Sequence, residues 1–168
     1  MTRWILISLS LLTAACGFSP VYGTLGSDNA YGSEEILNYV RISNIPDREG
    51  QMLRNDLIDR FYKSSRPTNP RYRLKVQPIK ETLSELDITI SSDSTRGQLR
   101  MDTKMTLSDY ETREVLLERN IHALSSYNIL GSEFATRVSE QNTRENVLND
   151  LARQIENHTV LYFKRTLQ

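Results

Sequence analysis

The sequence contains few of the residue types on which several classes of functional site depend. Its 168 residues include one cysteine, two histidines and one tryptophan. One cysteine excludes an internal disulfide and every zinc motif that is built on cysteine pairs. The 21 basic and 21 acidic residues leave a formal net charge of +0, so the chain as a whole has no electrostatic attraction to nucleic acid. We therefore expect no nucleic-acid partner, and any electrostatic function must come from local clustering of charge.

Motifs that would indicate catalysis are also missing. The two histidines, His122 and His158, are far apart, and neither has a second ligand at metal-binding spacing. The sequence has no P-loop, no G-x-S-x-G elbow and no H-E-x-x-H motif. We predict no enzymatic activity, no catalytic residue, no metal site and no small-molecule cofactor.

The first 15 residues have the layout of a secretory signal peptide. Arg3 supplies a positive charge, Trp4 to Leu12 form an apolar run of nine residues, and small residues follow. A membrane-spanning helix needs about 20 apolar residues, so this run is too short to span a bilayer. The stretch Leu12-Thr13-Ala14-Ala15-Cys16 resembles a bacterial lipobox, with Leu12 one position further from the cysteine than is usual. The resemblance implies cleavage before Cys16 and its modification by lipid, including fatty acids such as palmitate; an ordinary signal peptide with an incidental cysteine is the alternative.

Lipid on Cys16 would decide where the mature protein resides. Two or three acyl chains give stable membrane anchoring, whereas one chain is marginal. Gly17 follows the cysteine in place of the Asp that commonly retains bacterial lipoproteins in the inner membrane. The resemblance therefore implies the outer membrane of a Gram-negative cell, with the anchor in the inner leaflet and the protein on the periplasmic face. Residues 16–32 are rich in glycine and small polar residues, and they read as a lipidated tether.

Residues 33–168 carry the hydrophobic periodicity of one folded domain. Period-two alternation predicts strands at 39–45, 72–91, 98–107 and 115–125, with Pro78 marking an edge or bulge in the second. Apolar stripes at helical spacing predict one helix from Asp47, as its cap, to about Ser65, and a long helix over 132–168. The order strand, helix, three strands, helix predicts an α+β fold. The two helices would pack on one face of a four-stranded, mostly antiparallel sheet as a two-layer sandwich.

Charge is segregated along this domain although the total is balanced. Residues 41–80 contain ten basic and four acidic residues, a net charge of +6, whereas residues 81–118 have a net charge of −5. Five basic residues are candidates for binding an anion such as a phosphate: Arg71, Arg73, Lys75, Arg96 and Arg100. The first three share one face of a strand and the other two lie near a strand tip. A solvated outer face of the sheet is the alternative explanation of this pattern.

Three short stretches resemble the LptE family of lipopolysaccharide-assembly lipoproteins. They are the start of the mature chain, Cys16-Gly17-Phe18-Ser19-Pro20-Val21-Tyr22-Gly23; Ile42-Ser43-Asn44-Ile45-Pro46 with the helix that follows it; and Val147-Leu148-Asn149-Asp150-Leu151-Ala152-Arg153-Gln154-Ile155. The resemblance implies two helices against a four-stranded sheet. It also implies a non-enzymatic role, in which the protein plugs the outer-membrane β-barrel LptD, helps it assemble and binds lipopolysaccharide. The five basic candidates would then contact lipopolysaccharide phosphates.

Two other functional classes are compatible with the sequence. The chain could be a different outer-membrane lipoprotein that binds peptidoglycan or another envelope component. It could also be an envelope hydrolase with a site assembled from scattered residues, although the scarcity of histidine argues against this.

Overall fold

The structure is a computed structural model that describes residues 35–62, 65–88 and 94–166. The predicted signal peptide (1–15), the lipidation site Cys16 and the tether (16–32) lie outside the described residues, so they stay predictions. The described residues belong to one compact unit with its own hydrophobic core. In this part of the chain no helix is both long enough and apolar enough to span a membrane.

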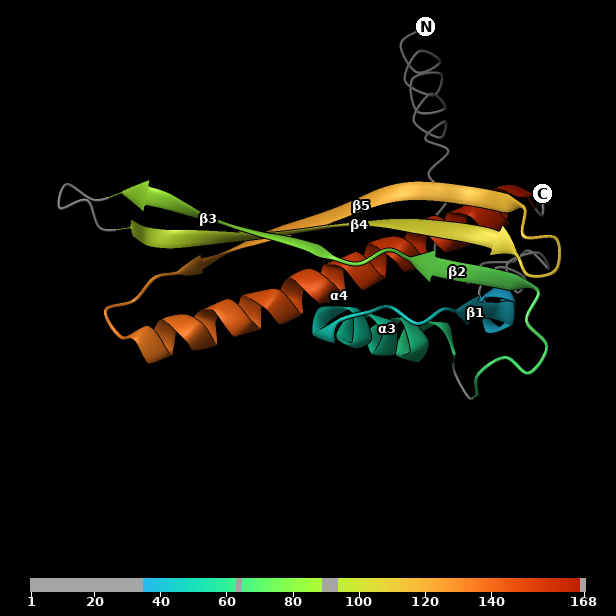
Figure 1. The fold of residues 1–168 in the computed structure, drawn as a ribbon, viewed down its shortest axis with the longest axis horizontal. Coiled ribbons are helices and arrows are strands. Elements are labelled where there is room, and N and C mark those ends of the chain that lie inside the picture. Colours follow the sequence, from blue (N-terminus) through green and yellow to red (C-terminus); the bar gives the residue numbers. More distant parts are fainter. Residues whose placement is uncertain (1–34, 63–64, 89–93, 167–168) are drawn as a thin grey trace, which may run out of the picture. The chain divides into compact units, whose positions relative to one another are not determined.

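The chain folds into one layer of strands and one layer of helices (Figure 1). In chain order the elements are η2 (Ile36–Tyr39), β1 (Val40–Ile42), α3 (Arg48–Phe61), β2 (Tyr72–Val76), β3 (Lys80–Ile88), β4 (Ser94–Asp109), β5 (Val115–Asn128) and α4 (Glu133–Thr166). Both α-helices pack on the same face of the sheet (Figure 1). The predicted α+β class and two-layer arrangement are therefore confirmed, with five strands where four were expected.

Strand β4 organises the sheet because it is long enough to pair with three other strands. One edge of β4 pairs along its length with β5, and the other edge pairs first with β3 and then with β2. All three pairings are antiparallel. Strand β1 joins the outer edge of β2, and this pair is parallel because α3 carries the chain back across the layer. The sheet is thus mixed, with its single parallel pair at one end.

The fifth strand results from a break at Pro78 in the stretch predicted as one strand. Proline has no N–H for a strand ladder, so the chain leaves β2 after Val76 and resumes as β3 at Lys80. The break is closed by the Gln77 backbone, whose N–H donates to the Lys104 carbonyl at 2.9 Å. The hydroxyl of Thr103 donates to the Gln77 carbonyl at 2.8 Å. The two segments therefore pair with different halves of β4.

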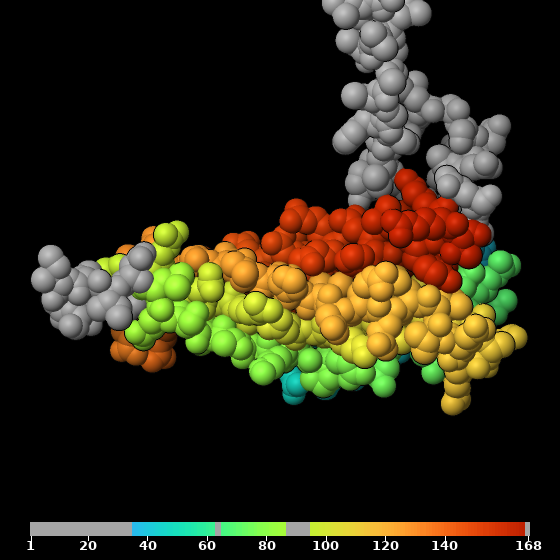
Figure 2. Space-filling model, turned by 90° about the horizontal axis from the view of Figure 1, so that it is seen from above, coloured from blue at the N-terminus to red at the C-terminus, as the bar shows by residue number. Residues whose placement is uncertain are grey.

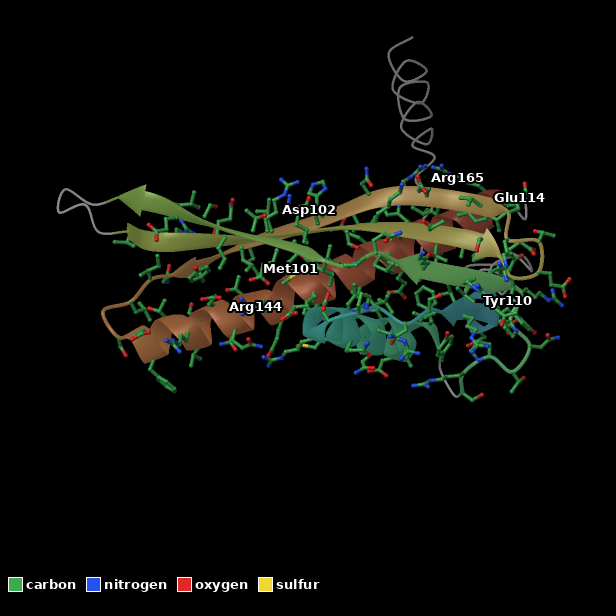
Figure 3. All side chains as sticks on the ribbon, viewed as in Figure 1. Met101, Asp102, Tyr110, Glu114, Arg144 and Arg165 are labelled. Atoms are coloured by element: carbon green, nitrogen blue, oxygen red, sulfur yellow. The ribbon has the colours of Figure 1, made fainter. Side chains whose placement is uncertain are left out.

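The core lies between the sheet and the helices, as the alternation of β4 predicts. Leu99, Met101, Met105 and Leu107 are all fully buried. Met101 and its neighbour Asp102 lie on opposite sides of the sheet (Figure 3), with Met101 towards the helices. The helices contribute a second set of buried residues: Leu53, Leu57, Phe61, Leu148, Leu151, Ile155 and Phe163. Among the described residues, no helix lies across the face of the sheet that carries Asp102 (Figure 2).

The start of α3 differs from the sequence prediction. Asp47 precedes the helix, but its side chain makes no capping hydrogen bond, and its φ of 66° places it in the left-handed region. The side-chain amide of Gln51 instead donates to Asn44 Oδ1 at 3.0 Å and to the Ile45 carbonyl. Gly50 allows this close approach, because a Cβ there would lie 2.7 Å from Ile45 Cγ2. The helix is therefore held to the preceding loop by Gln51.

Candidate functional site

The five basic residues predicted to bind an anion form two separate groups on the sheet. Lys75 of β2 pairs with Thr106 of β4, whereas Arg96 and Arg100 pair with residues of β3 and β5. Along β4, Thr106 is six residues from Arg100 and ten from Arg96, which corresponds to about 20 and 33 Å at the rise of a strand. One phosphate group cannot contact both groups. We call the two regions the β1 end (residues 39–42, 71–76 and 109–114) and the β3 end (residues 80–86, 95–102 and 124–144).

At the β1 end, arginine and tyrosine side chains pack against each other. The guanidinium carbon of Arg71 lies 5.0 Å from the ring centroid of Tyr39, and that of Arg73 lies 4.8 Å from the ring centroid of Tyr110. Arg41 Nη1 donates to the Tyr110 hydroxyl at 3.3 Å. We call these five residues the arginine–tyrosine surface, and Tyr110 marks its position in Figure 3. Both stacking distances are within the range of cation–π attraction.

Backbone pairing holds this surface in place. The N–H of Arg71 donates to the Tyr39 carbonyl, and the N–H of Tyr110 donates to the Arg71 carbonyl, each at 2.9 Å. Parallel pairing of β1 with β2 places Arg41 directly opposite Arg73. Three arginines from two sequence-distant segments therefore share one end of the sheet.

The three arginines of this surface are not paired with an acid in the part of the chain that the structure describes, although Asp109, Glu111 and Glu114 lie in the neighbouring turn. Among the residues that the structure describes, no carboxylate lies within ion-pair distance of Arg41, Arg71 or Arg73. The nearby Asp109 carboxylate accepts hydrogen bonds from the backbone N–H groups of Thr112 and Glu111, each at 2.9 Å. Those bonds lower the pKa of Asp109, and they hold its carboxylate against the backbone of its own turn.

Tyr62 covers the edge of β1 that has no partner strand among the described residues, and it lies close enough to the arginines for their charge to affect its pKa. Its hydroxyl donates to the Val40 carbonyl at 2.7 Å and accepts the N–H of Ile42 at 3.3 Å. Burial raises the pKa of Tyr62, while the Ile42 hydrogen bond and the positive charges of Arg54, Arg66 and Arg41 oppose the rise. Arg54 Nε is itself buried and has no hydrogen-bond partner among the described residues. Arg54 and Arg66 thus add positive charge beside Tyr62, while Asp109, Glu111 and Glu114 add negative charge in the turn at the same end of the sheet.

At the β3 end, the predicted anion ligands have other interactions. Arg100 binds both carboxylate oxygens of Asp102, with its Nε 2.9 Å from Oδ2 and its Nη2 2.7 Å from Oδ1. This fork lowers the pKa of Asp102 and raises that of Arg100. The side chain of Arg96 is exposed, and it too has an interaction partner. Arg100 therefore lies beside an acid that partly offsets its charge.

A second charged cluster at the β3 end joins α4 to the edge of the sheet. Arg144 Nη2 lies 2.7 Å from Glu81 Oε1 of β3 and 2.7 Å from Glu140 Oε1 of its own helix. These partly buried hydrogen bonds raise the pKa of Arg144 strongly. Burial raises the pKa of nearby Tyr127, and Glu140, Glu85 and Glu81 raise it further while Arg144 opposes them. The field at Tyr127 is thus predominantly negative, whereas that at Tyr62 is positive.

Exposed apolar side chains also gather at the β3 end. They are Leu83, Leu124, Leu130, Phe134 and Val138, and Phe134 is the most exposed of them at 78%. Leu124 is the β5 partner of Arg100, so an apolar and a cationic side chain stand side by side on the open face. Such a pairing suits a ligand that carries both acyl chains and anionic groups.

An open depression of about 500 Å³ lies on the sheet between the two ends, where β2 gives way to β3. Its charged lining residues, Arg100, Asp102 and Lys104, are all engaged in ion pairs. His122 also lines it, while His158 lies on α4. The described residues contain no group of three or more His, Cys, Asp or Glu side chains that could hold a metal ion.

Sequence reasoning missed three members of the arginine–tyrosine surface. Tyr110 falls in the turn between the predicted strands 98–107 and 115–125. Tyr39 and Arg41 belong to the predicted strand 39–45, and the sequence does not show which strand pairs with it. Alternation alone does identify the outward face of Arg41 and Arg73. Only the pairing of β1 with β2 brings the two residues together.

The fold of this domain is one that several solved bacterial lipoproteins share. It is similar to rare lipoprotein B of Shewanella oneidensis (TM-score 0.61, 10% identity, 77% of this chain and 97% of that one). It is also similar to a minor lipoprotein of Acinetobacter baumannii (TM-score 0.56, 18% identity, 74% and 92%). An uncharacterized lipoprotein B of Nitrosomonas europaea matches with a TM-score of 0.58 at 14% identity, covering 74% and 83%. At these identities the likeness shows the fold.

The sequence identifies the family within this class. The family model for LptE, lipopolysaccharide-assembly, matches residues 37–159. The chain therefore belongs to the LptE family, a family of non-enzymatic lipoproteins that act in lipopolysaccharide assembly. It is also 24% identical over 160 residues to an uncharacterized protein of Rickettsia prowazekii, covering 95% of this chain and 96% of that one.

Proposed function

We propose that this protein is an outer-membrane lipoprotein that plugs the LptD β-barrel, helps that barrel assemble and takes part in lipopolysaccharide transport to the cell surface. The observation that carries the proposal is the family match from residue 37 to residue 159. That range begins in η2 and ends within α4, so it includes the five described strands, all of α3 and most of α4. The role needs no enzymatic chemistry.

The proposed anchor is the lipid on Cys16. Cleavage before this residue and its acylation would attach the domain to the inner leaflet of the outer membrane, on the periplasmic side. The domain itself would remain in water, which agrees with the polar character of its open face. Lipid is the only non-protein group that the proposal requires.

The proposed partner is a polar barrel interior. The lumen of an outer-membrane barrel is lined by polar side chains, so a plug must present a polar surface and a narrow cross-section. The domain is built around a 34-residue helix and a 16-residue strand, each about 50 Å long. Its open sheet face carries paired charges such as Lys104 with Glu118 and Arg100 with Asp102. These features support insertion along the axis of a barrel.

The proposed contact with lipopolysaccharide lies at the β3 end. Arg96 and Arg100 could bind its phosphates, and the neighbouring Leu124 could contact an acyl chain. The other three candidates, Arg71, Arg73 and Lys75, lie too far away to share that contact. We assign the surface around Arg71 and Arg73 a different role below.

A mild-detergent pull-down of a C-terminally tagged chain from outer membranes tests the proposal. We expect a stoichiometric large β-barrel and a bait whose intact mass corresponds to cleavage before Cys16 plus acyl chains. A lipidated bait without a barrel would favour the alternative, a lipoprotein that binds peptidoglycan or another envelope component. An unlipidated soluble bait would contradict the anchor.

The lipopolysaccharide contact has its own test. Charge reversal in Arg96→Glu/Arg100→Glu should weaken lipopolysaccharide binding by the full chain. Arg153→Glu/Arg165→Glu is the matched control, because it makes the same charge change at exposed positions on α4 outside the β3 end. Equal binding by the two double variants would show that the β3 end is not the contact.

A further inference from the structure

We propose that the arginine–tyrosine surface at the β1 end docks on the phosphate groups of anionic phospholipids in the leaflet that holds the anchor. This inference rests on the proposed lipidation of Cys16. It adds a second contact with the membrane, made by the folded domain itself. The contact would orient the domain with its β1 end at the headgroups and its β3 end away from them.

The surface has the charge that such a ligand requires. Arg41, Arg71 and Arg73 contribute three positive charges, and the described residues supply no ion-pair partner for any of them. Arg41 and Arg71 are exposed and Arg73 is half-buried. Lys75 continues the same row along β2 and is exposed. Unpaired, outward-facing cations retain their attraction for an anionic surface, whereas cations in ion pairs lose much of it.

The side chains are also held in place before any ligand binds. Arg71 and Arg73 lie over tyrosine rings at 5.0 and 4.8 Å, and Arg41 is hydrogen-bonded to the Tyr110 hydroxyl. Stacking leaves the edges of the guanidinium planes available to donate hydrogen bonds to phosphate oxygens. Less side-chain entropy is then lost on binding, because the arginines are already restrained.

The tyrosines favour a bilayer over a free phosphate as the partner. Tyrosine is enriched at membrane–water interfaces, where its ring meets the apolar layer and its hydroxyl meets the headgroups. Tyr39 is 42% exposed although its ring is large and apolar. Two tyrosines interleaved with three arginines match the composition of that interface. A single soluble anion would use the cations but would leave the exposed ring in water.

The position of the surface along the chain fits this partner. Tyr39 is only 23 residues after Cys16, and the described domain begins at Glu35. A chain of 23 residues spans at most about 80 Å, so the anchor keeps this surface within reach of the leaflet. Tethering makes the second contact intramolecular, and a weak site then suffices for docking.

The test places a fluorescent probe beside the surface in the full lipidated chain. Ser108 pairs with Arg73, so Ser108→Cys reports on the β1 end, and Ser126→Cys, which pairs with Gln98, reports on the β3 end. Each labelled protein is reconstituted into phosphatidylcholine vesicles with or without phosphatidylglycerol. Quenching by a headgroup-located quencher measures the ratio of docked to undocked domains.

We expect strong quenching at position 108 only in the vesicles that contain phosphatidylglycerol, with reversal by high salt, and little quenching at position 126. Arg71→Ala/Arg73→Ala should lower the ratio of docked to undocked domains by about 30-fold, since each basic side chain near an anionic surface strengthens binding about fivefold. Arg137→Ala/Arg153→Ala, the matched control, should leave it unchanged. Arg71→Lys/Arg73→Lys should retain part of the docking, because it keeps the charge and loses the planar fork.

Several results would overturn the inference. Equal quenching in both kinds of vesicle, or no difference between the two alanine variants, would show that these arginines do not dock on the membrane. If the fluorescence of the probe at position 108 changed only after addition of lipopolysaccharide or of the barrel, the surface would be assigned to that partner. Thermal unfolding of each variant separates lost docking from lost folding. The intact mass and the pull-down report separately on the anchor and on the barrel, so failure of the docking leaves the proposed function standing.

Discussion

The two ends of this domain carry similar numbers of arginines but use them differently. At the β1 end, Arg71 and Arg73 lie over tyrosine rings without a carboxylate partner among the described residues. At the β3 end, Arg100 and Arg144 are bound by Asp102, Glu81 and Glu140. A balanced total charge therefore conceals one end whose arginines have no acidic partner among the described residues and one end where Arg100 and Arg144 are paired with acids.

The same contrast holds for apolar side chains. Phe163 of α4 is buried at the β1 end, 4.7 Å from the ring of Tyr72, whereas Phe134 at the start of the same helix is 78% exposed. The helix is thus covered at one end and open at the other. The domain is well packed near β1, and near β3 it presents a surface that can receive a partner.

The largest expected effect tests this difference in packing. Phe163→Ala should lower the free energy of unfolding by about 3–5 kcal/mol, because it leaves a cavity in the core. Phe134→Ala should change it by less than about 0.5 kcal/mol, because the ring is in water. Chemical denaturation of both variants measures the two values. Similar losses in both would show that the two ends are equally packed.

The second effect tests how the edge of β1 is closed. Tyr62→Phe removes the hydroxyl that bridges the Val40 carbonyl and the Ile42 N–H, and it should cost about 1–2 kcal/mol of stability. Tyr39→Phe is the control, since the exposed Tyr39 contacts Arg71 through its ring. Denaturant titration with hydrogen exchange at Ile42 measures the change. If the two variants are equally stable, the hydroxyl bridge contributes nothing.

A smaller effect tests the packing of the β3 end. A Cβ at Gly97 would overlap the ring of Tyr127, so Gly97→Ala should displace that ring and cost about 1 kcal/mol. Gly131→Ala is the control, because nothing lies within 4 Å of the added methyl group. Combining Gly97→Ala with Tyr127→Ala should cost less than the sum of the two single changes. Additive costs would indicate that the ring is already displaced.

The smallest effect concerns the Arg100–Asp102 pair. Arg100 lowers the pKa of Asp102, so the pair adds stability above the unfolded-state pKa of Asp, and that stability is lost as the pH falls through the lower folded-state value. Both side chains are well exposed, so the thermal midpoint should hardly change. An NMR titration should show the Asp102 pKa below the ordinary value of about 3.9 and closer to it in Arg100→Gln. An unchanged pKa would mean that the fork does not form in solution.

Much of the fold could be predicted because its signals are local. The alternation of residues 98–107 identified β4 and its buried face, and spacings of three and four residues identified α4. The break at Pro78 was visible, but whether it would bend one strand or separate two depended on pairing with β4. Asp47 does occupy the N-cap position of α3, but its side chain makes no capping hydrogen bond, and Gln51 instead fastens the helix to Asn44 and Ile45 beside Gly50.

The candidate site was only partly predictable, for a related reason. All five basic candidates are outside the buried core, and Arg71, Arg73 and Lys75 do lie together. Their distance from Arg96 and Arg100 follows from the length of β4, over which β2 and β3 pair with different halves. No local sequence pattern predicts the distance between these two groups of basic residues.

The sequence by itself determined which residues face the core and which face water, since periodicity acts between near neighbours. Only the tertiary structure decided which outward-facing residues meet. Tyr39 and Arg41 reach Arg71 and Arg73 because α3 returns the chain to the edge of β2, and Tyr110 joins them because β4 ends there. Pairing between distant segments depends on burying the whole core at once, so the arginine–tyrosine surface exists only in the folded domain.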